Sequence, residues 1–166
     1  MLNPMDPEFF PIKQAKMFGT FPANSIIGVG LLPYINRLKT PKVSILNLGD
    51  RKGENVYYLS ENDTKNKIDK IYTIVEPNEI YDKIFKENTA GLEKNILEYK
   101  GEMVQVLCVD SSLMETNETL DMRMNMYYNK LEIGGIICGN NSELPTVKNA
   151  LNFFKRKNKI GTKPYF

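Results

Sequence analysis

The chain has 166 residues, of which 42% are apolar and 25% are charged, and its net charge is +2. This composition is typical of one globular domain with a single core. The small net charge gives no strong signal for binding to nucleic acid or to an anionic membrane. The sequence has no histidine, which excludes histidine-based acid–base catalysis, nucleophile pairs and metal sites.

The first forty residues predict an N-terminal arm followed by a helix. Residues 1–20 are rich in proline at first and then read IKQAKMFG, which is compatible with a helix, so we expect an arm or lid. Residues 24–38 have apolar positions at helical spacing. Because proline is best tolerated in a first turn, we expect this helix to begin near Gly30 or Leu31, with Pro33 close behind. We therefore separate residues 1–40 from a main region at 41–166, within one domain overall.

Four apolar runs predict the strands of the main region, at residues 43–48, 71–75, 104–109 and 136–138. Segments with helical spacing, such as ENVYYLSEN and LPTVKNALNFF, follow them. This alternation indicates βαβ units, and so an α/β fold with a mainly parallel sheet and helices on both of its faces. Runs such as VQVLCV have no polar side, as expected of parallel strands buried on both faces.

The connecting segments differ in character. DTKNKIDK, before the second strand, predicts a polar loop, and the helix predicted after that strand breaks near residues 89–91. Ser111 or Ser112 is a candidate N-cap for the helix after the third strand. Pro145 suits the first turn of the helix after the fourth strand, and the final IGTKPYF predicts an edge strand.

The carboxyl ends of the four strands carry the candidate site, because ligands of open α/β sheets bind beyond this edge. The residues there are Gly49–Asp50, Glu76–Pro77, Asp110–Ser111 and Gly139–Asn140. Glycine lets a ligand approach the backbone closely, and an acid can accept both hydroxyls of a ribose. The loop GDRKG lacks the third glycine of G-x-G-x-x-G and the G-K-[ST] of a P-loop. Taken alone it fits either a nucleoside-binding loop or a plain turn between a strand and a helix.

The order of the motifs carries a resemblance. ILNLGDRKGENVYYLSE followed by IYTIVEPN resembles motifs I and II of class I S-adenosylmethionine-dependent methyltransferases. VLCVDSS, LEIGGIICGNN and TVKNALNFF, in that order, are similar to a small-molecule O-methyltransferase subgroup of that family. The resemblance covers residues 42–154. It implies a Rossmann-like fold and transfer of a methyl group from S-adenosylmethionine to an oxygen or nitrogen of an unknown, small-molecule or other, acceptor.

The resemblance also implies roles for individual residues. Gly49, Asp50 and Gly53 would line the methionine and ribose parts of the cofactor. Glu76, followed by Pro77, would accept the ribose diol. Asp110 would lie at the reaction centre, beside the donor methyl group, and is the candidate general base.

Several positions depart from the family pattern. Asn47 stands where the family has an acid before the first glycine, and Asn140 and Asn141 replace an acid pair that binds metal in some members. One carboxylate with two amides is a poor magnesium site, so we expect no metal. Residues 76–110 are too few for a full crossover before the third apolar strand, which leaves Glu102 and Met103 as candidates near the adenine. The family's closing antiparallel hairpin has no counterpart, so we expect a fold shortened in the middle and at the C-terminus.

Two other readings remain open. The first alternative to an active methyltransferase is a methyltransferase-like binding or assembly module without catalysis. The second is a Rossmann domain that binds another nucleotide cofactor. An uncovered sheet edge would favour pairing with a second copy, as a homodimer. No apolar run reaches the roughly 20 residues that span a bilayer, and the first residues do not resemble a signal peptide. Cys108 and Cys138 lie in apolar runs and suit a core rather than a disulfide, so we expect a cytoplasmic protein.

Overall fold

The computed structural model describes residues 17–21, 27–49, 53–74, 79–92, 95–109, 117–140 and 144–158. The strands are β1 (Met17–Phe21), β2 (Val43–Leu48), β3 (Ile68–Thr73), β4 (Ile96–Glu98), β5 (Val104–Val109) and β6 (Leu131–Asn140). The helices are α1 (Ile27–Arg37), α2 (Glu54–Asn62), α3 (Glu79–Asn88), α4 (Asn117–Tyr128) and α5 (Pro145–Lys157).

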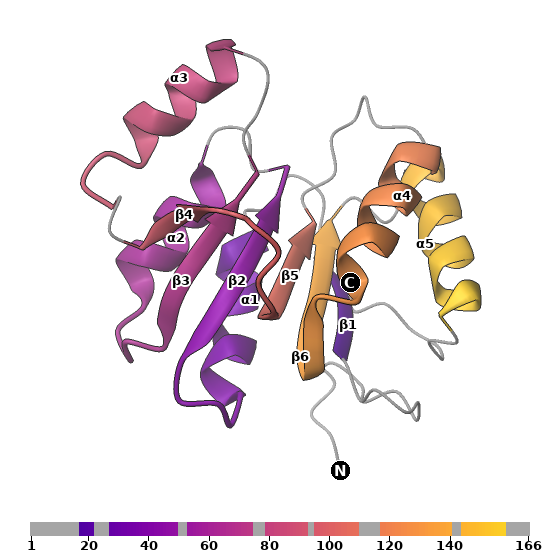
Figure 1. The fold of residues 1–166 in the computed structure, drawn as a ribbon, viewed down its shortest axis with the longest axis horizontal. Helices are drawn as coiled ribbons and strands as arrows, with labels where there is room; N and C mark the ends of the chain where they lie inside the picture. The colour runs from indigo at the N-terminus through magenta and orange to yellow at the C-terminus, as the bar shows by residue number, and fades with distance from the viewer. Residues whose placement is uncertain are drawn as a thin grey trace.

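These six strands form one sheet in the order β1-β6-β5-β2-β3-β4, and each neighbouring pair is parallel (Figure 1). The predicted Rossmann-like α/β fold is therefore confirmed. The predicted strands 43–48 and 104–109 have the expected bounds, and the helix after the fourth strand begins at Pro145.

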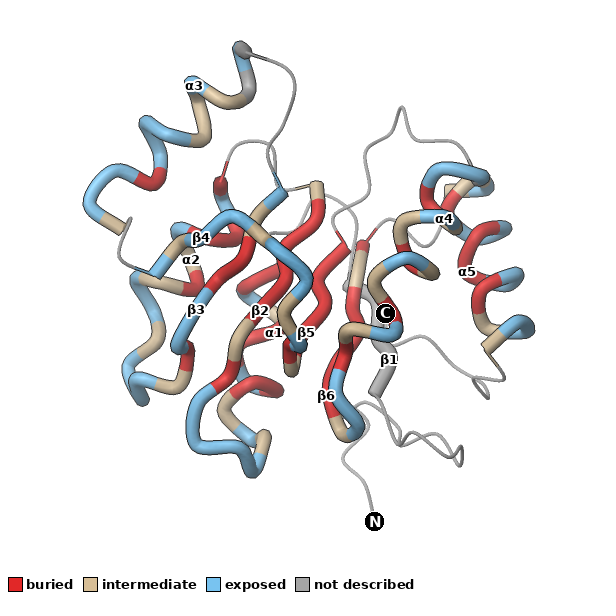
Figure 2. The backbone as a smooth tube through the Cα atoms, viewed as in Figure 1, coloured by how far each residue is buried: buried red, intermediate tan, exposed pale blue. Residues whose placement is uncertain are grey.

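Helices cover both faces of the sheet, as the sequence predicts. On one face α1 and α2 pack against side chains such as Ile45, Ile71 and Val106. On the other face α4 and α5 pack against Leu46 and its neighbours in β5 and β6. Successive residues of a strand point to opposite faces, so a strand buried on both sides is apolar throughout. Figure 2 shows this as nearly continuous buried stretches along the central strands.

The N-terminal region differs from the prediction. Residues 17–21, taken as part of a helix-compatible arm, form β1, which pairs with β6 so that Phe18 is opposite Ile137. Pairing with the open edge of β6 outweighs the weak local preference of a five-residue segment. β1 thus covers the edge beside β6.

The helix that follows also begins earlier than predicted. α1 starts at Ile27 rather than near Gly30, and Pro33 lies in its interior. Ile27, Leu31 and Ile35 are spaced one helical turn apart and are all buried. Pro33 is on the exposed side of α1, where water can bond the carbonyl that loses its partner. Tertiary packing of the apolar stripe therefore sets the start of this helix.

Two strands are longer than predicted. β3 begins at Ile68, inside the segment predicted as a polar loop, because Ile68 is buried opposite Val43. It ends at Thr73 rather than Val75. β6 begins at Leu131, before the double glycine. A Cβ on Gly135 would lie 2.6 Å from the carbonyl oxygen of Gln105, so only glycine lets β6 approach β5 there.

The middle of the fold is shortened, as predicted. β4 has three residues, and residues 99–103 then cross directly to β5 without a helix (Figure 1). Tyr99 covers the face that a helix would otherwise cover, because its ring packs edge to face against Tyr72 and Tyr127, with centroids 5.8 Å away in both pairs.

Other predictions concern single side chains. From their sequence, the methionines of α4 are expected to pack against the sheet. Met124 does so, but Met122 and Met126 point away from it and are each 55% exposed. They lie on the outer side of α4, half a turn from the buried row Leu120, Met124 and Tyr128. Cys108 and Cys138 are buried and are not joined in a disulfide. Ser111, Ser112 and the strand predicted at 160–166 lie outside the described residues. None of the described helices is long and apolar enough to cross a membrane.

Candidate functional site

The strand order has its topological switch point between β2 and β5. From β2 the chain proceeds through β3 to β4 on one side, and then returns to build β5 and β6 on the other. Connections that leave two adjacent parallel strands in opposite directions open a crevice at their carboxyl ends, where ligands of open α/β folds bind. Leu48 and Val109 are register partners at this edge. Gly49 follows the first of them in the chain, and Asp110 follows the second.

Gly49 and Gly53 both have left-handed backbone conformations, with φ of 82° and 74°. Residues other than glycine adopt this conformation at a cost of about 1–2 kcal/mol. Gly53 is also buried, and a Cβ there would lie 2.9 Å from Thr89 Cγ2 and 3.2 Å from the ring of Phe85. Both glycines are thus required by the turn from β2 into α2, and Gly53 is further fixed by its packing against the end of α3.

Asn55 joins two helices at this edge of the sheet. It lies in the first turn of α2, its side chain is 1% exposed, and its Oδ1 accepts a hydrogen bond from the backbone N–H of Gly28 at 3.1 Å. This N–H is one of the first-turn donors of α1 that have no partner within the helix. Sequence reasoning missed Asn55, because its partner lies 27 residues earlier in the chain and no local pattern marks such a contact.

Other predicted site residues have different outcomes. Asp50, Glu76, Pro77, Asp110 and Asn141 lie outside the described residues. Asn140 is the last residue of β6 and is buried, opposite Phe21 of β1. Asn47 is buried within β2, between Thr73 and Cys108. The structure therefore brings Gly49, Gly53 and Asn140 to one edge of the sheet.

Glu102 and Met103 lie at the wrong end of β5 for contacts with a ligand in this crevice. They precede Val104, the first residue of β5, and at about 3.3 Å per residue they lie roughly 20 Å or more from the carboxyl end of the strand at Val109. Glu102 serves the crossover instead: its carboxylate accepts the N–H of Lys100 at 2.7 Å, and its carbonyl accepts the Tyr99 hydroxyl at 2.8 Å. Burial, together with the charge of Glu102 and a hydrogen bond to it, raises the pKa of Tyr72.

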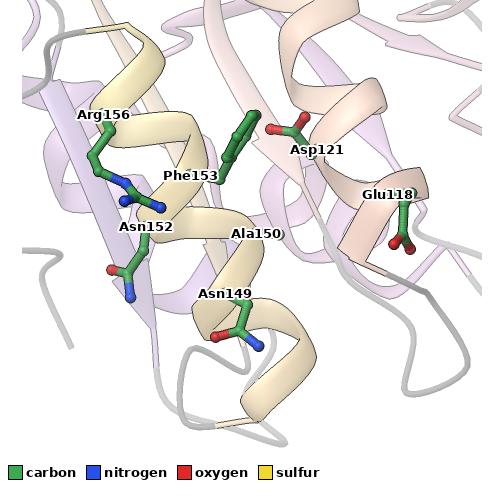
Figure 3. A pocket seen from close by; sticks show the side chains of 7 residues that line it. All are labelled: Glu118, Asp121, Asn149, Ala150, Asn152, Phe153 and Arg156. Atoms are coloured by element: carbon green, nitrogen blue, oxygen red, sulfur yellow. The ribbon is translucent and has the colours of Figure 1, made fainter.

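A separate groove of about 510 Å³ lies between α4 and α5 (Figure 3). Its walls carry charges of both signs, from Glu118 and Asp121 on α4 and Arg156 on α5. Figure 3 shows the ring of Phe153 directed toward Asp121 across the groove. Most of these side chains are exposed. Among the residues that the structure describes, no group of three or more acidic or cysteine side chains is placed to hold a metal ion.

The fold resembles those of solved proteins. The crystal structure of precorrin-6y C5,15-methyltransferase from Geobacter metallireducens GS-15 superimposes with a TM-score of 0.58 and 16% sequence identity, over 84% of this chain and 74% of that one. TrmN from Thermus thermophilus gives a TM-score of 0.54 and 12% identity, over 75% of this chain and 40% of that one. At these identities the likeness is one of fold. No protein-family model matches the sequence, and no curated protein matches it.

Proposed function

We propose that the protein is an S-adenosylmethionine-dependent methyltransferase that acts on an oxygen or nitrogen of an acceptor not yet identified. The observation that carries the proposal is the left-handed Gly49 at the switch point between β2 and β5, where folds of this kind form a crevice. The same crevice is the ligand site of open α/β folds in general. A fold shared with a methyltransferase supports the choice of cofactor, as does the order of the sequence motifs.

The residues around the crevice fit this cofactor. Gly49 has no side chain to block a ligand at the end of β2, and Gly53 holds the far end of the loop against α3. In the proposal, Gly49, Asp50 and Gly53 line the methionine and ribose parts of the cofactor. Glu76, beside Pro77, accepts hydrogen bonds from both ribose hydroxyls. S-adenosylmethionine supplies an electrophilic methyl group on a sulfonium.

Asp110 is the proposed general base. It follows the last residue of β5 in the chain, next to the strand that leads to Gly49. The chain contains no histidine to take that role. A carboxylate at this position orients the acceptor and accepts its proton. We propose that no metal takes part, because the amides of Asn140 and Asn141 are weaker ligands for a divalent cation than carboxylates.

The proposal is tested by calorimetric titration of S-adenosylmethionine into the wild-type protein and the Glu76→Ala variant, with EDTA present. Hydrogen bonds to a charged group contribute roughly 1.5–3 kcal/mol each. We therefore expect the dissociation constant to rise about 10- to 1,000-fold in the variant. Circular dichroism melts serve as the control for folding. Equal affinities in two well-folded proteins would remove Glu76 from the site, and absence of binding to the wild type would reject the proposed function.

The same titration separates the other two readings. Tight binding of S-adenosylmethionine, without methyl transfer to any of a panel of hydroxyl and amine acceptors, would favour a binding module. Binding of a different nucleotide cofactor in its place would favour another kind of Rossmann domain.

A further inference from the structure

The buried amide of Asn55 has a consequence for the cofactor site. We infer that Asn55 is a positioning residue, which sets the place of Gly53, at the far end of the proposed cofactor loop, by tying the beginning of α2 to the beginning of α1. The inference rests on the proposed function, because it concerns the loop that would hold S-adenosylmethionine. It assigns a role in the site to α1, which the sequence predicts as a helix after an N-terminal arm and outside the main region at 41–166.

The bond between Asn55 and Gly28 satisfies groups on both helices. A side-chain amide that is 1% exposed must find hydrogen-bond partners within the protein. The N–H of Gly28 also needs an acceptor from outside its own helix. The 3.1 Å hydrogen bond gives a partner to both the Asn55 amide oxygen and the Gly28 N–H, which are 27 residues apart in the sequence.

The contact between the two helices is also close. A Cβ on Gly28 would lie 3.2 Å from both Leu59 Cγ and Tyr58 Cδ1, so α1 already touches α2 and cannot move nearer. The hydrogen bond prevents movement in the other direction. Together the two contacts fix the first turn of α2 relative to α1.

This fixed turn is one of two supports for the far end of the loop. Gly53 is the N-cap of α2, two residues before Asn55, and it packs against Thr89 and Phe85 at the end of α3. β2 holds the near end, at Gly49. Without the Asn55 amide, the Gly28 N–H loses its acceptor and the first turn of α2 loses its hydrogen bond to α1. Gly53 is then held less rigidly, and binding of the cofactor must pay for the lost order.

The test compares the Asn55→Ala and Asn55→Asp variants with a matched control. Gln105→Ala is the control, because Gln105 Oε1 also accepts a backbone N–H, that of Ser44 at 2.6 Å, but at the amino end of β2. Both alanine variants therefore remove one side-chain acceptor from one backbone donor. The measurements are the dissociation constant of S-adenosylmethionine by calorimetry, the melting temperature, and hydrogen exchange of the Gly28 amide by NMR.

We expect Asn55→Ala to raise the dissociation constant about 10-fold, the equivalent of one hydrogen bond. Exchange at Gly28 should become faster in this variant. Asn55→Asp keeps an acceptor oxygen, so exchange at Gly28 should stay slower than in Asn55→Ala, although the buried carboxyl group should lower the melting temperature. Gln105→Ala should lower the melting temperature but leave the dissociation constant unchanged.

If the wild type binds S-adenosylmethionine and Asn55→Ala binds it equally well, this inference is overturned and the proposed function stands. A loss of affinity in Gln105→Ala equal to that in Asn55→Ala would also overturn it, because general destabilisation would then explain both. Absence of any binding by the wild type would overturn the proposed function and this inference together.

Discussion

Gly53 shows how one residue serves both the chain's geometry and its packing. Its φ of 74° lies in the left-handed region, and the space where a Cβ would stand is occupied by Thr89. These are separate requirements, because a left-handed residue on an open surface meets only the first. Gly91 is such a residue: its φ is 88°, and nothing lies within 4 Å of the place where its Cβ would stand.

The comparison of Gly53→Ala with Gly91→Ala separates the two effects. We expect Gly91→Ala to lower the free energy of unfolding by about 1 kcal/mol, the cost of a left-handed alanine. Gly53→Ala should lower it by at least about 2 kcal/mol, because Thr89 and the turn must also shift. Urea unfolding of the three proteins measures both values. Equal losses would mean that the contact with Thr89 relaxes freely.

At the scale of the elements, the crossover after β4 replaces a helix with a row of aromatic rings. The sequence predicts a reduced strand or helix in this crossover, because too few residues separate Glu76 from Asp110. It does not predict what covers the bare sheet, because Tyr72, Tyr99 and Tyr127 come from three segments far apart in the chain. Their contact can be inferred only once the strand order is known.

Substitution of Tyr99 tests this covering role. Tyr99→Ala removes a ring that packs against the core on the side of α4, and we expect a loss of about 2 kcal/mol, less than for a fully buried aromatic residue. Tyr99→Phe keeps the ring and loses only the bond from its hydroxyl to Glu102, so about 1 kcal/mol should be lost. Urea unfolding is again the measurement. Similar losses in both variants would assign the stabilisation to the hydroxyl and not to the ring.

The difference between local sequence signals and contacts between distant segments explains which elements were predicted correctly. β2 and β5 are mainly apolar runs with buried residues on both faces, so their bounds follow from local sequence. β1 is a strand because β6 offers it a partner more than a hundred residues away. In the candidate site, the sequence alone identifies Gly49 and Gly53 as the two glycines of the GDRKG motif. The bond between Asn55 and Gly28 joins helices that precede and follow β2, and no local pattern predicts it.

At the scale of the whole molecule, buried tyrosines make stability depend on high pH. Burial is the main cause that raises the pKa of Tyr72, Tyr99 and Tyr128 above the usual 10.0, and the charge of Glu102 adds to it for the first two. Below about pH 10 these tyrosines are neutral in both the folded and the unfolded chain. Above it, the unfolded chain loses their protons more readily, so the free energy of unfolding falls as pH rises.

Lys155 acts in the opposite direction, but it is a single group. Burial lowers its pKa from 10.5, so the unfolded chain holds its proton more tightly, and deprotonation as pH rises favours the folded state. Three tyrosines against one lysine should leave a net loss of stability above about pH 10. The Tyr72→Phe variant isolates one part of that loss.

We therefore expect the melting temperature of the wild-type protein to fall between about pH 9.5 and 11, and to fall less steeply in Tyr72→Phe, because one proton is no longer released on unfolding. Tyr57→Phe is the control, since Tyr57 is 51% exposed and on the outer side of α2. Calorimetric melts across this pH range give the slopes, and absorbance near 295 nm follows ionisation of the tyrosines. The Tyr72 variant should also melt at a lower temperature at neutral pH, because Glu102 loses its hydrogen bond. A slope in Tyr72→Phe that equals those of the wild type and the control would mean that Tyr72 titrates alike in both states, and that the crossover does not shield it from water.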